Sequence, residues 1–286
     1  MTRLESLAPG KVNLCLYLGE RRADGLHELV SLVQAVDLVD EIGLEPAPPG
    51  ATGDEAICPG VEGPNLAVAA LAAYRAATGW DAPPQRVSIE KHIPVAAGMG
   101  GGSSDAAAVL RLAAQAAGRP DDPRLNAIAP GVGADVASLL APGLALMTGA
   151  GERVSPLAAL EPLWLLVLVL PDRLSTAEVY READRLGLGR SRRALREIRG
   201  EIEASLELGG DLPPELMHND LEPAARSLCP GIGDALAAAR TAGAQRVLVS
   251  GSGPTVFGVF RGGEPSIDFT ALERYPAARV LRPVTW

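Results

Sequence analysis

The first clear pattern in the chain is an alternation of hydrophobic and polar positions near the N-terminal end. VNLCLYL, residues 12–18, places four aliphatic side chains on one side and Asn13, Cys15 and Tyr17 on the other. A period of two residues predicts a β-strand. The same alternation puts Lys11 on the polar side together with Asn13. Two further strands are expected over residues 86–93, RVSIEKHI, and over the apolar run 163–170, LWLLVLVL, which is too short to cross a bilayer as a helix.

Helical patterns lie between these strands. Residues 65–77 read as a helix with Asn65 as N-cap. The clearest helix begins with Ser103 or Ser104 as cap and ends at Gly118. A short helix is expected over residues 133–143, with Asp135 in its first turn.

The second half of the chain repeats this mixture of strands and helices. A helix with the capping-box pair Ser175 and Glu178 follows the apolar run. Further helices are expected at 191–208, 216–228, 233–243 and near Phe269, a strand pair at 246–260, and a last strand at 278–286. The fold class is therefore α+β, with two domains, 1–153 and 154–286, divided at the glycine-rich TGAGERVSP.

Composition narrows the classes of function. The net charge of −9 argues against a nucleic-acid partner, whose binding surface is basic, and aromatic residues are only 3% of the chain. Three cysteines without a CxxC pair favour a reduced, cytoplasmic protein. The sequence shows no signal peptide and no membrane segment, and its three histidines are too scattered to predict a metal cluster.

The segment PVAAGMGGGSSDAAAVL, residues 94–110, predicts a phosphate-binding loop. Glycines allow close backbone approach, and the amides at a helix N-terminus attract anions, whereas a simple turn needs only one or two glycines. The segment is not a P-loop, because the chain contains no Gly-Lys-Ser or Gly-Lys-Thr. It is not the dinucleotide fingerprint either, because the third glycine of that pattern falls on Ser103.

Three motifs together resemble the GHMP kinase superfamily, which includes galactokinase, homoserine kinase and mevalonate kinase. They are APGKVNLCLYL, the glycine loop and VSGSGPTVFGVF, in family order between about residues 8 and 260. RRADGLHELVSLVQAVDL, STAEVY and HNDLE bring the chain nearest to the branch that phosphorylates a cytidine diphospho-alcohol. The resemblance implies an N-terminal α/β domain with a mixed sheet, a C-terminal ferredoxin-like α/β sandwich, and an active site in the cleft between them.

The resemblance also implies roles for individual residues, with ATP as co-substrate and Mg²⁺ accompanying it. Lys11 and Asp135 are expected to be catalytic, the lysine as the positive group and the aspartate as the base. The residues around SGSGPT that shape the active site are Ser250, Gly251, Ser252 and Gly253. The expected ATP-binding set is Pro94, Val95, Ala96, Ala97, Gly98, Met99, Gly100, Gly101, Gly102, Ser103, Ser104, Asn65 and Lys91.

The expected residues for the small-molecule acceptor are Asn13, Leu26, His27 and Met217. Family members usually have a tyrosine, which stacks on the cytosine, where this chain has Leu26, and often an aromatic residue where it has Met217. Two alternatives therefore stay open: a GHMP kinase for a non-nucleotide alcohol, and a non-catalytic ATP-binding sensor. The sensor is disfavoured because the chain keeps both Lys11 and Asp135.

Overall fold

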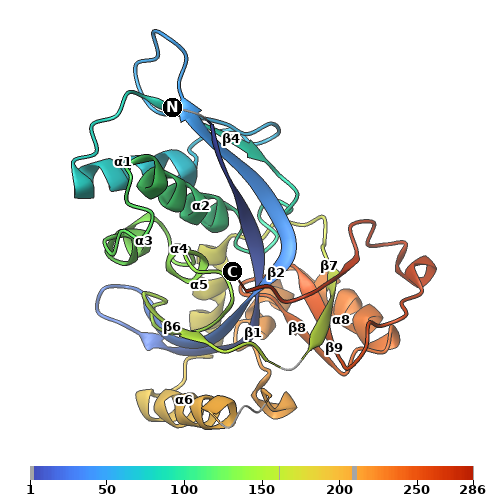
Figure 1. The fold of residues 1–286 in the computed structure, drawn as a ribbon. Coiled ribbons are helices and arrows are strands. Elements are labelled where there is room, and N and C mark those ends of the chain that lie inside the picture. Colours follow the sequence, from blue (N-terminus) through green and yellow to red (C-terminus); the bar gives the residue numbers. More distant parts are fainter. Residues whose placement is uncertain (1–2, 161, 208–210, 286) are drawn as a thin grey trace. The chain divides into compact units, whose positions relative to one another are not determined.

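The computed structural model describes residues 3–160, 162–207 and 211–285, which form two compact units (Figure 1). Of these described residues, unit 1 comprises those within 1–10, 38–95 and 100–142, and unit 2 comprises those within 11–37, 96–99 and 143–286. The segments of the two units alternate along the sequence. The reason is that two long strands, β1 (Leu4–Arg21) and β2 (His27–Pro46), each contribute residues to both units.

Unit 1 is built from strands and helices that share one apolar core. The second part of β2 pairs antiparallel with β4 (Gln85–Glu90), and β3 (Glu55–Ile57) runs parallel to β4. Buried side chains of β2 and β4 pack with those of the helices in a single cluster. The helices are α1 (Leu66–Thr78), α2 (Gly101–Ala116), α3 (Leu125–Val132) and α4 (Val136–Leu139).

In unit 2 the first part of β2 pairs antiparallel with β5 (Leu144–Gly149), and β5 pairs with β6 (Arg153–Leu157). A separate antiparallel sheet has the order β10-β7-β9-β8 and shares its core with α5, α7 and α8. Its strands are β7 (Leu163–Leu168), β8 (Arg246–Val249), β9 (Val256–Arg261) and β10 (Arg279–Leu281). The helices are α5 (Thr176–Leu186), α6 (Arg192–Glu207), α7 (Glu222–Leu228), α8 (Gly231–Thr241), η1 (Pro214–Leu216) and η2 (Phe269–Leu272).

Most of the predicted elements are present, and several boundaries differ. The helix expected over 216–228 is α-helical only from Glu222: Leu216 ends η1, and residues 217–221 are extended or in turns and hydrogen-bond to other segments. The capping box is also wrong: Ser175 is the N-cap of α5, but its side chain makes no capping hydrogen bond. Within the described residues, no helix is long and apolar enough to cross a membrane.

Candidate functional site

The glycine loop divides between the two units, and its central part, residues 96–99, belongs to unit 2. Gly98 has a φ of +74°, and a Cβ built there would lie 2.7 Å from the carbonyl oxygen of Gly253 and 2.8 Å from that of Ser250. The Ser250 hydroxyl also donates a hydrogen bond to the Gly98 carbonyl at 3.1 Å. Only glycine fits this contact, so the glycine loop and the SGSG loop, two of the three sequence motifs, meet through their backbones.

The remaining motif, APGKVNLCLYL, contacts the glycine loop through Lys11. The Lys11 amide donates to the Met99 carbonyl at 2.9 Å, and the Lys11 ammonium donates to Asn13 Oδ1 at 2.7 Å. Asn13 Nδ2 in turn donates to the Ser31 hydroxyl at 2.8 Å, which fixes the amide orientation. Lys11 is only 4% exposed, so unit 2 holds an ammonium group in a largely desolvated position beside the glycine loop.

The remaining part of the glycine loop opens α2 in unit 1. The helix begins at Gly101 with Gly100 as N-cap, so the prediction of Ser103 or Ser104 as the cap is wrong. The cap conformation is left-handed, which glycine adopts at little cost, and no side chain caps the helix. Four glycine and serine residues therefore form the first turn of a 16-residue helix, where backbone amides are available to an anion.

Polar atoms without partners mark the same turn. Among the described residues, Ser104 Oγ and Asp105 Oδ1 are buried and have no hydrogen-bond partner. Asp105 Oδ2 accepts from the Lys91 ammonium at 2.9 Å, and Lys91 also donates to Asp40 at 2.5 Å. Burial, and to a smaller extent the neighbouring Asp40 carboxylate, raises the pKa of the Asp105 carboxyl to about 7, although the Lys91 ammonium acts to lower it. Buried oxygen atoms of this kind are typical of a site that a ligand or ion completes.

Two residues of the expected ATP-binding set, Asn65 and Lys91, have partners within unit 1. Asn65 is the N-cap of α1, as predicted, and its Oδ1 accepts from the Ala67 amide at 2.9 Å. Lys91 bridges Asp40 and Asp105 in a buried ion-pair triad. Sequence reasoning missed this triad, because Asp40 and Asp105 lie 51 and 14 residues from Lys91 and nothing local pairs them.

Asp135 is the N-cap residue of the short helix α4 in unit 1. It is half-buried, and its carbonyl oxygen accepts a hydrogen bond from the Ser138 hydroxyl at 2.9 Å. A Cβ built on the nearby Gly133 would lie 3.7 Å from Ser103 Oγ. The GADV segment therefore lies beside the first turn of α2, within the same unit. Lys11 belongs to unit 2.

The expected acceptor residues in unit 2 have different surroundings. His27 is buried, with its Nε2 2.7 Å from Asp184 Oδ1 and its ring centroid 5.3 Å from that of Tyr180. Leu26, by contrast, is 55% exposed, and Met217 is only 1% exposed. Sequence reasoning missed Tyr180 and Asp184, although their spacing of four residues places them on one face of α5.

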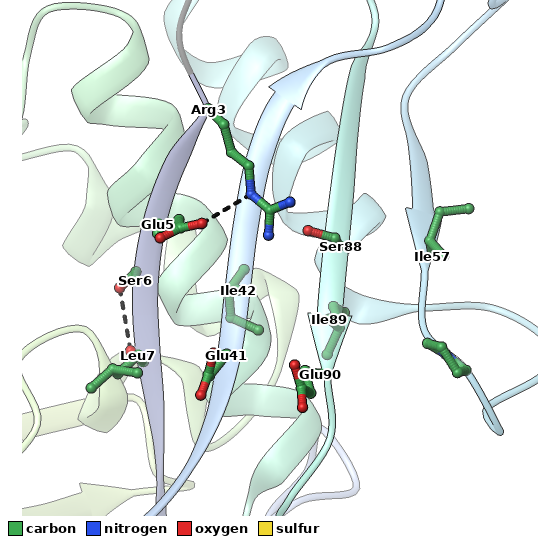
Figure 2. A pocket seen from close by; sticks show the side chains of 11 residues that line it. Arg3, Glu5, Ser6, Leu7, Glu41, Ile42, Ile57, Ser88, Ile89 and Glu90 are labelled. Atoms are coloured by element: carbon green, nitrogen blue, oxygen red, sulfur yellow. Dashed lines mark hydrogen bonds and ion pairs between the residues drawn. The ribbon is translucent and has the colours of Figure 1, made fainter.

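The described part of unit 1 also has a cavity of about 520 Å³ over strands β1, β2, β3 and β4 (Figure 2). Glu5, Glu41 and Glu90 line it, together with a single cationic side chain, Arg3, which pairs with Glu5 at 3.1 Å. None of the residues expected to bind ATP or the acceptor lines this cavity. Three carboxylates repel a triphosphate, so we assign the functional site to the motif residues and not to this cavity.

Two family models match the chain: the GHMP kinases N terminal domain over residues 65–143 and the GHMP kinases C terminal domain over residues 194–277. The chain is 42% identical over 269 residues to a 4-diphosphocytidyl-2-C-methyl-D-erythritol kinase of Anaeromyxobacter dehalogenans (strain 2CP-C), covering 91% of this chain and 82% of that protein. It is 40% identical to the enzyme of the same name from Mycolicibacterium gilvum (strain PYR-GCK), covering 86% and 79%.

Solved structures agree with this relationship. A crystal structure of a 4-(cytidine 5'-diphospho)-2C-methyl-D-erythritol kinase superposes with a TM-score of 0.74 at 36% identity, covering 99% of this chain and all of that one. The crystal structure of L. major mevalonate kinase shares the fold with a TM-score of 0.69 at 18% identity, covering 100% of this chain and 96% of that one. These likenesses, together with the motifs gathered around the glycine loop, show that the chain belongs to the GHMP kinases, a family of ATP-dependent small-molecule kinases, and within them to the 4-diphosphocytidyl-2-C-methyl-D-erythritol kinase family.

Proposed function

We propose that the protein transfers the γ-phosphoryl group of ATP to the 2-hydroxyl of 4-diphosphocytidyl-2-C-methyl-D-erythritol, a step in isoprenoid precursor biosynthesis by the methylerythritol phosphate pathway. The observation that carries the proposal is the 42% identity over 91% of the chain to a kinase named for this substrate. The polar groups gathered at the three motifs support it. We also propose a cytoplasmic location, because the three cysteines form no CxxC pair and burial raises the pKa of the Cys15 thiol to about 12.

In the proposed reaction the backbone amides at the start of α2 bind the phosphates of ATP. The acceptor oxygen attacks the γ-phosphorus, the bond from that phosphorus to the β–γ bridging oxygen breaks, and ADP leaves. The hydroxyl proton passes to the Asp135 carboxylate, which acts as general base. The Lys11 ammonium stabilises the negative charge that develops on the oxygens during transfer. Its burial favours this role, since a charge acts more strongly where water is excluded.

Mg²⁺ is the cation expected with ATP, and the residues in the first turn of α2 fit it. Ser104 Oγ and Asp105 Oδ1 are two of the four buried side-chain oxygens without a hydrogen-bond partner among the described residues, and oxygen is the ligand type that Mg²⁺ prefers. We propose that these two side chains hold the ion. When bound, it supplies charge neutralisation for the phosphate oxygens.

The acceptor end of the site is proposed to centre on His27. Its ring is oriented by Asp184, which leaves the other ring nitrogen for hydrogen bonding to the edge of a base. Tyr180 offers the aromatic ring that this chain lacks at Leu26, and stacking on a base is worth roughly 1–3 kcal/mol. Met217 is too buried to cover a ligand without rearrangement, so we propose that Tyr180, and not Met217, contacts the base.

One observation favours a second candidate, a GHMP kinase for a non-nucleotide alcohol. The position before His27 carries the exposed leucine Leu26, and not the stacking tyrosine that the family usually has. The test is a substrate panel: ATP-dependent phosphorylation of the cytidine and uridine diphospho-alcohols, of homoserine and of mevalonate.

We expect turnover of the cytidine compound, and His27→Ala should reduce the preference for cytidine over uridine. Phosphorylation of homoserine or mevalonate alone would leave only the second candidate. Tyr180→Leu removes the ring proposed to contact the base and should raise the KM for the cytidine compound. Tyr180→Phe is its matched control, because it keeps the ring and loses only the hydroxyl.

A further inference from the structure

The HNDLE segment, residues 218–222, contains a buried asparagine that the proposed reaction does not use. Asn219 is 3% exposed and lies between η1 and α7. Its Nδ2 donates to the carbonyl oxygens of Val249 and Gly251, both at 2.8 Å, and its Oδ1 accepts from the Leu221 amide at 2.9 Å. A side-chain amide is the group that offers two donors and an acceptor at this length. The side chain therefore connects the HNDLE segment with the SGSG loop.

The two carbonyls that Asn219 binds lie where β8 ends and the SGSG loop begins. Val249 is the last residue of β8, and Gly251 is the second residue of SGSG. A Cβ built on Gly251 would lie 3.1 Å from Asn13 Oδ1 and 3.4 Å from Lys11 Nζ. The backbone of Gly251 thus packs directly against the Lys11–Asn13 hydrogen bond. Asn219 binds the carbonyl oxygen of the same residue.

We propose that Asn219 is a positioning residue for Lys11: it holds the Gly251 backbone against the ammonium, so that the ammonium and Asn13 keep one arrangement. The inference rests on the proposed role of Lys11 in phosphoryl transfer. The contacts that connect Asn219 with Gly251 and Gly251 with Lys11 all lie within unit 2. A misplaced reacting group costs rate even where binding is retained, because transfer requires aligned atoms.

The test compares Asn219→Asp with a matched control, Gln34→Glu. Gln34 is also a buried amide of unit 2, and its Nε2 donates to two backbone carbonyls, those of Ala35 at 2.9 Å and Val284 at 3.3 Å. Each substitution replaces an NH₂ group with an oxygen facing two carbonyls, so both should reduce stability. We expect kcat to fall about 10- to 100-fold in Asn219→Asp with less than about a threefold change in KM for ATP, and to change less than about twofold in Gln34→Glu.

A second measurement does not depend on turnover. An acylating reagent, followed by mass spectrometry, reports how accessible the Lys11 ammonium is, and in the native chain Lys11 is only 4% exposed. We expect faster labelling of Lys11 in Asn219→Asp than in the wild type, and no change in Gln34→Glu. If Asn219→Asp does not fold, Asn219→Ser is used with Gln34→Ser as control. Serine is neutral and can donate only one hydrogen bond.

Gly251→Ala disturbs the same contact from the loop side. If Asn219 acts through Gly251, the effects of Asn219→Asp and Gly251→Ala on kcat are not additive, whereas those of Asn219→Asp and Gln34→Glu are. Equal losses of kcat and equal labelling rates in the Asn219 and Gln34 variants would overturn the inference. A wild-type protein that phosphorylates no alcohol in the panel would overturn the proposed function instead, and the labelling comparison would still test the position of Lys11.

Discussion

Two adjacent glycines at the start of α2, Gly101 and Gly102, offer a test that separates packing from phosphate binding. A Cβ built on Gly101 would lie 3.1 Å from Lys91 Nζ and 3.1 Å from Ile93 Cγ2. A Cβ built on Gly102 would lie 3.8 Å from Leu66 Cδ1, which is an ordinary van der Waals contact. Gly102 is exposed, while Gly101 is half-buried over the ion-pair triad of Lys91. The same substitution therefore meets two different surroundings one residue apart.

The expected free energies of unfolding follow from these contacts. Alanine in place of glycine within a helix stabilises by about 0.5–1 kcal/mol, because the unfolded chain loses less freedom on folding. Gly102→Ala should therefore raise the free energy of unfolding by up to about 1 kcal/mol. In Gly101→Ala the methyl group must displace an ammonium held by two carboxylates, and overpacking of this kind costs about 1–3 kcal/mol. We therefore expect the free energy of unfolding of Gly102→Ala to be about 1–3 kcal/mol higher than that of Gly101→Ala.

Urea unfolding measures the stability difference, and equilibrium binding of ATP measures the second effect. If the amides of this turn approach phosphates closely, the methyl group of Gly102→Ala occupies space that ATP needs. The variant should then be more stable than wild type and bind ATP at least about tenfold more weakly, a loss of about 1.4 kcal/mol. Unchanged ATP affinity in a folded Gly102→Ala would refute close approach at this position. Equal stability of the two variants would refute the tight packing of Lys91 under Gly101.

Three further predictions concern other parts of the site and fold. Asp135→Asn should lower kcat about 10²- to 10⁴-fold with ATP binding nearly unchanged, as steady-state kinetics would show. The double variant Asp135→Asn with Lys11→Ala should lose less kcat than the product of the two single fold-losses. A loss equal to that product would mean that the two residues serve different steps. Leu26→Tyr should lower KM for the cytidine substrate by adding a second ring, and an unchanged KM would exclude stacking there. Asp220→Asn should cost about 1–3 kcal/mol, since Asp220 accepts two bonds from the partly exposed Arg190. Burial opposes the charged form of Asp220, but these bonds lower its pKa, so its contribution is present above about pH 4 and is lost as the pH falls further. Urea unfolding from pH 6 to pH 3 should therefore show the difference between Asp220→Asn and wild type shrinking, and a constant difference would contradict the assignment.

Local patterns in the sequence were sufficient for much of the fold. The alternation of residues 12–18, the N-cap at Asn65 and the paired runs on either side of SGSGPT each specify an element through contacts within a few residues, and all are present in the structure. The glycine loop was found because a cluster of glycines ahead of a helix has few structural explanations. The family followed from three such motifs in order.

Strand β2 was not found from the sequence, although the buried apolar run that forms β7 was. Strand β2 spans 20 residues, and most of its central residues are buried, so its polar and apolar positions do not alternate cleanly. The start of α2 was misjudged because serine is the usual cap, whereas here Gly100 in a left-handed conformation begins the helix.

Contacts between residues distant in the sequence were decided only by the tertiary structure. Tyr180 comes to lie beside His27 because α5 packs near the start of β2 within unit 2. Lys91 contacts Asp40 and Asp105, and Asn219 contacts Gly251, because strand pairing and helix packing bring these residues together. Their spacing along the chain does not predict the contacts. The sequence could therefore identify the residue types that the chemistry requires. Which side chains orient them depends on packing between segments that no local pattern connects.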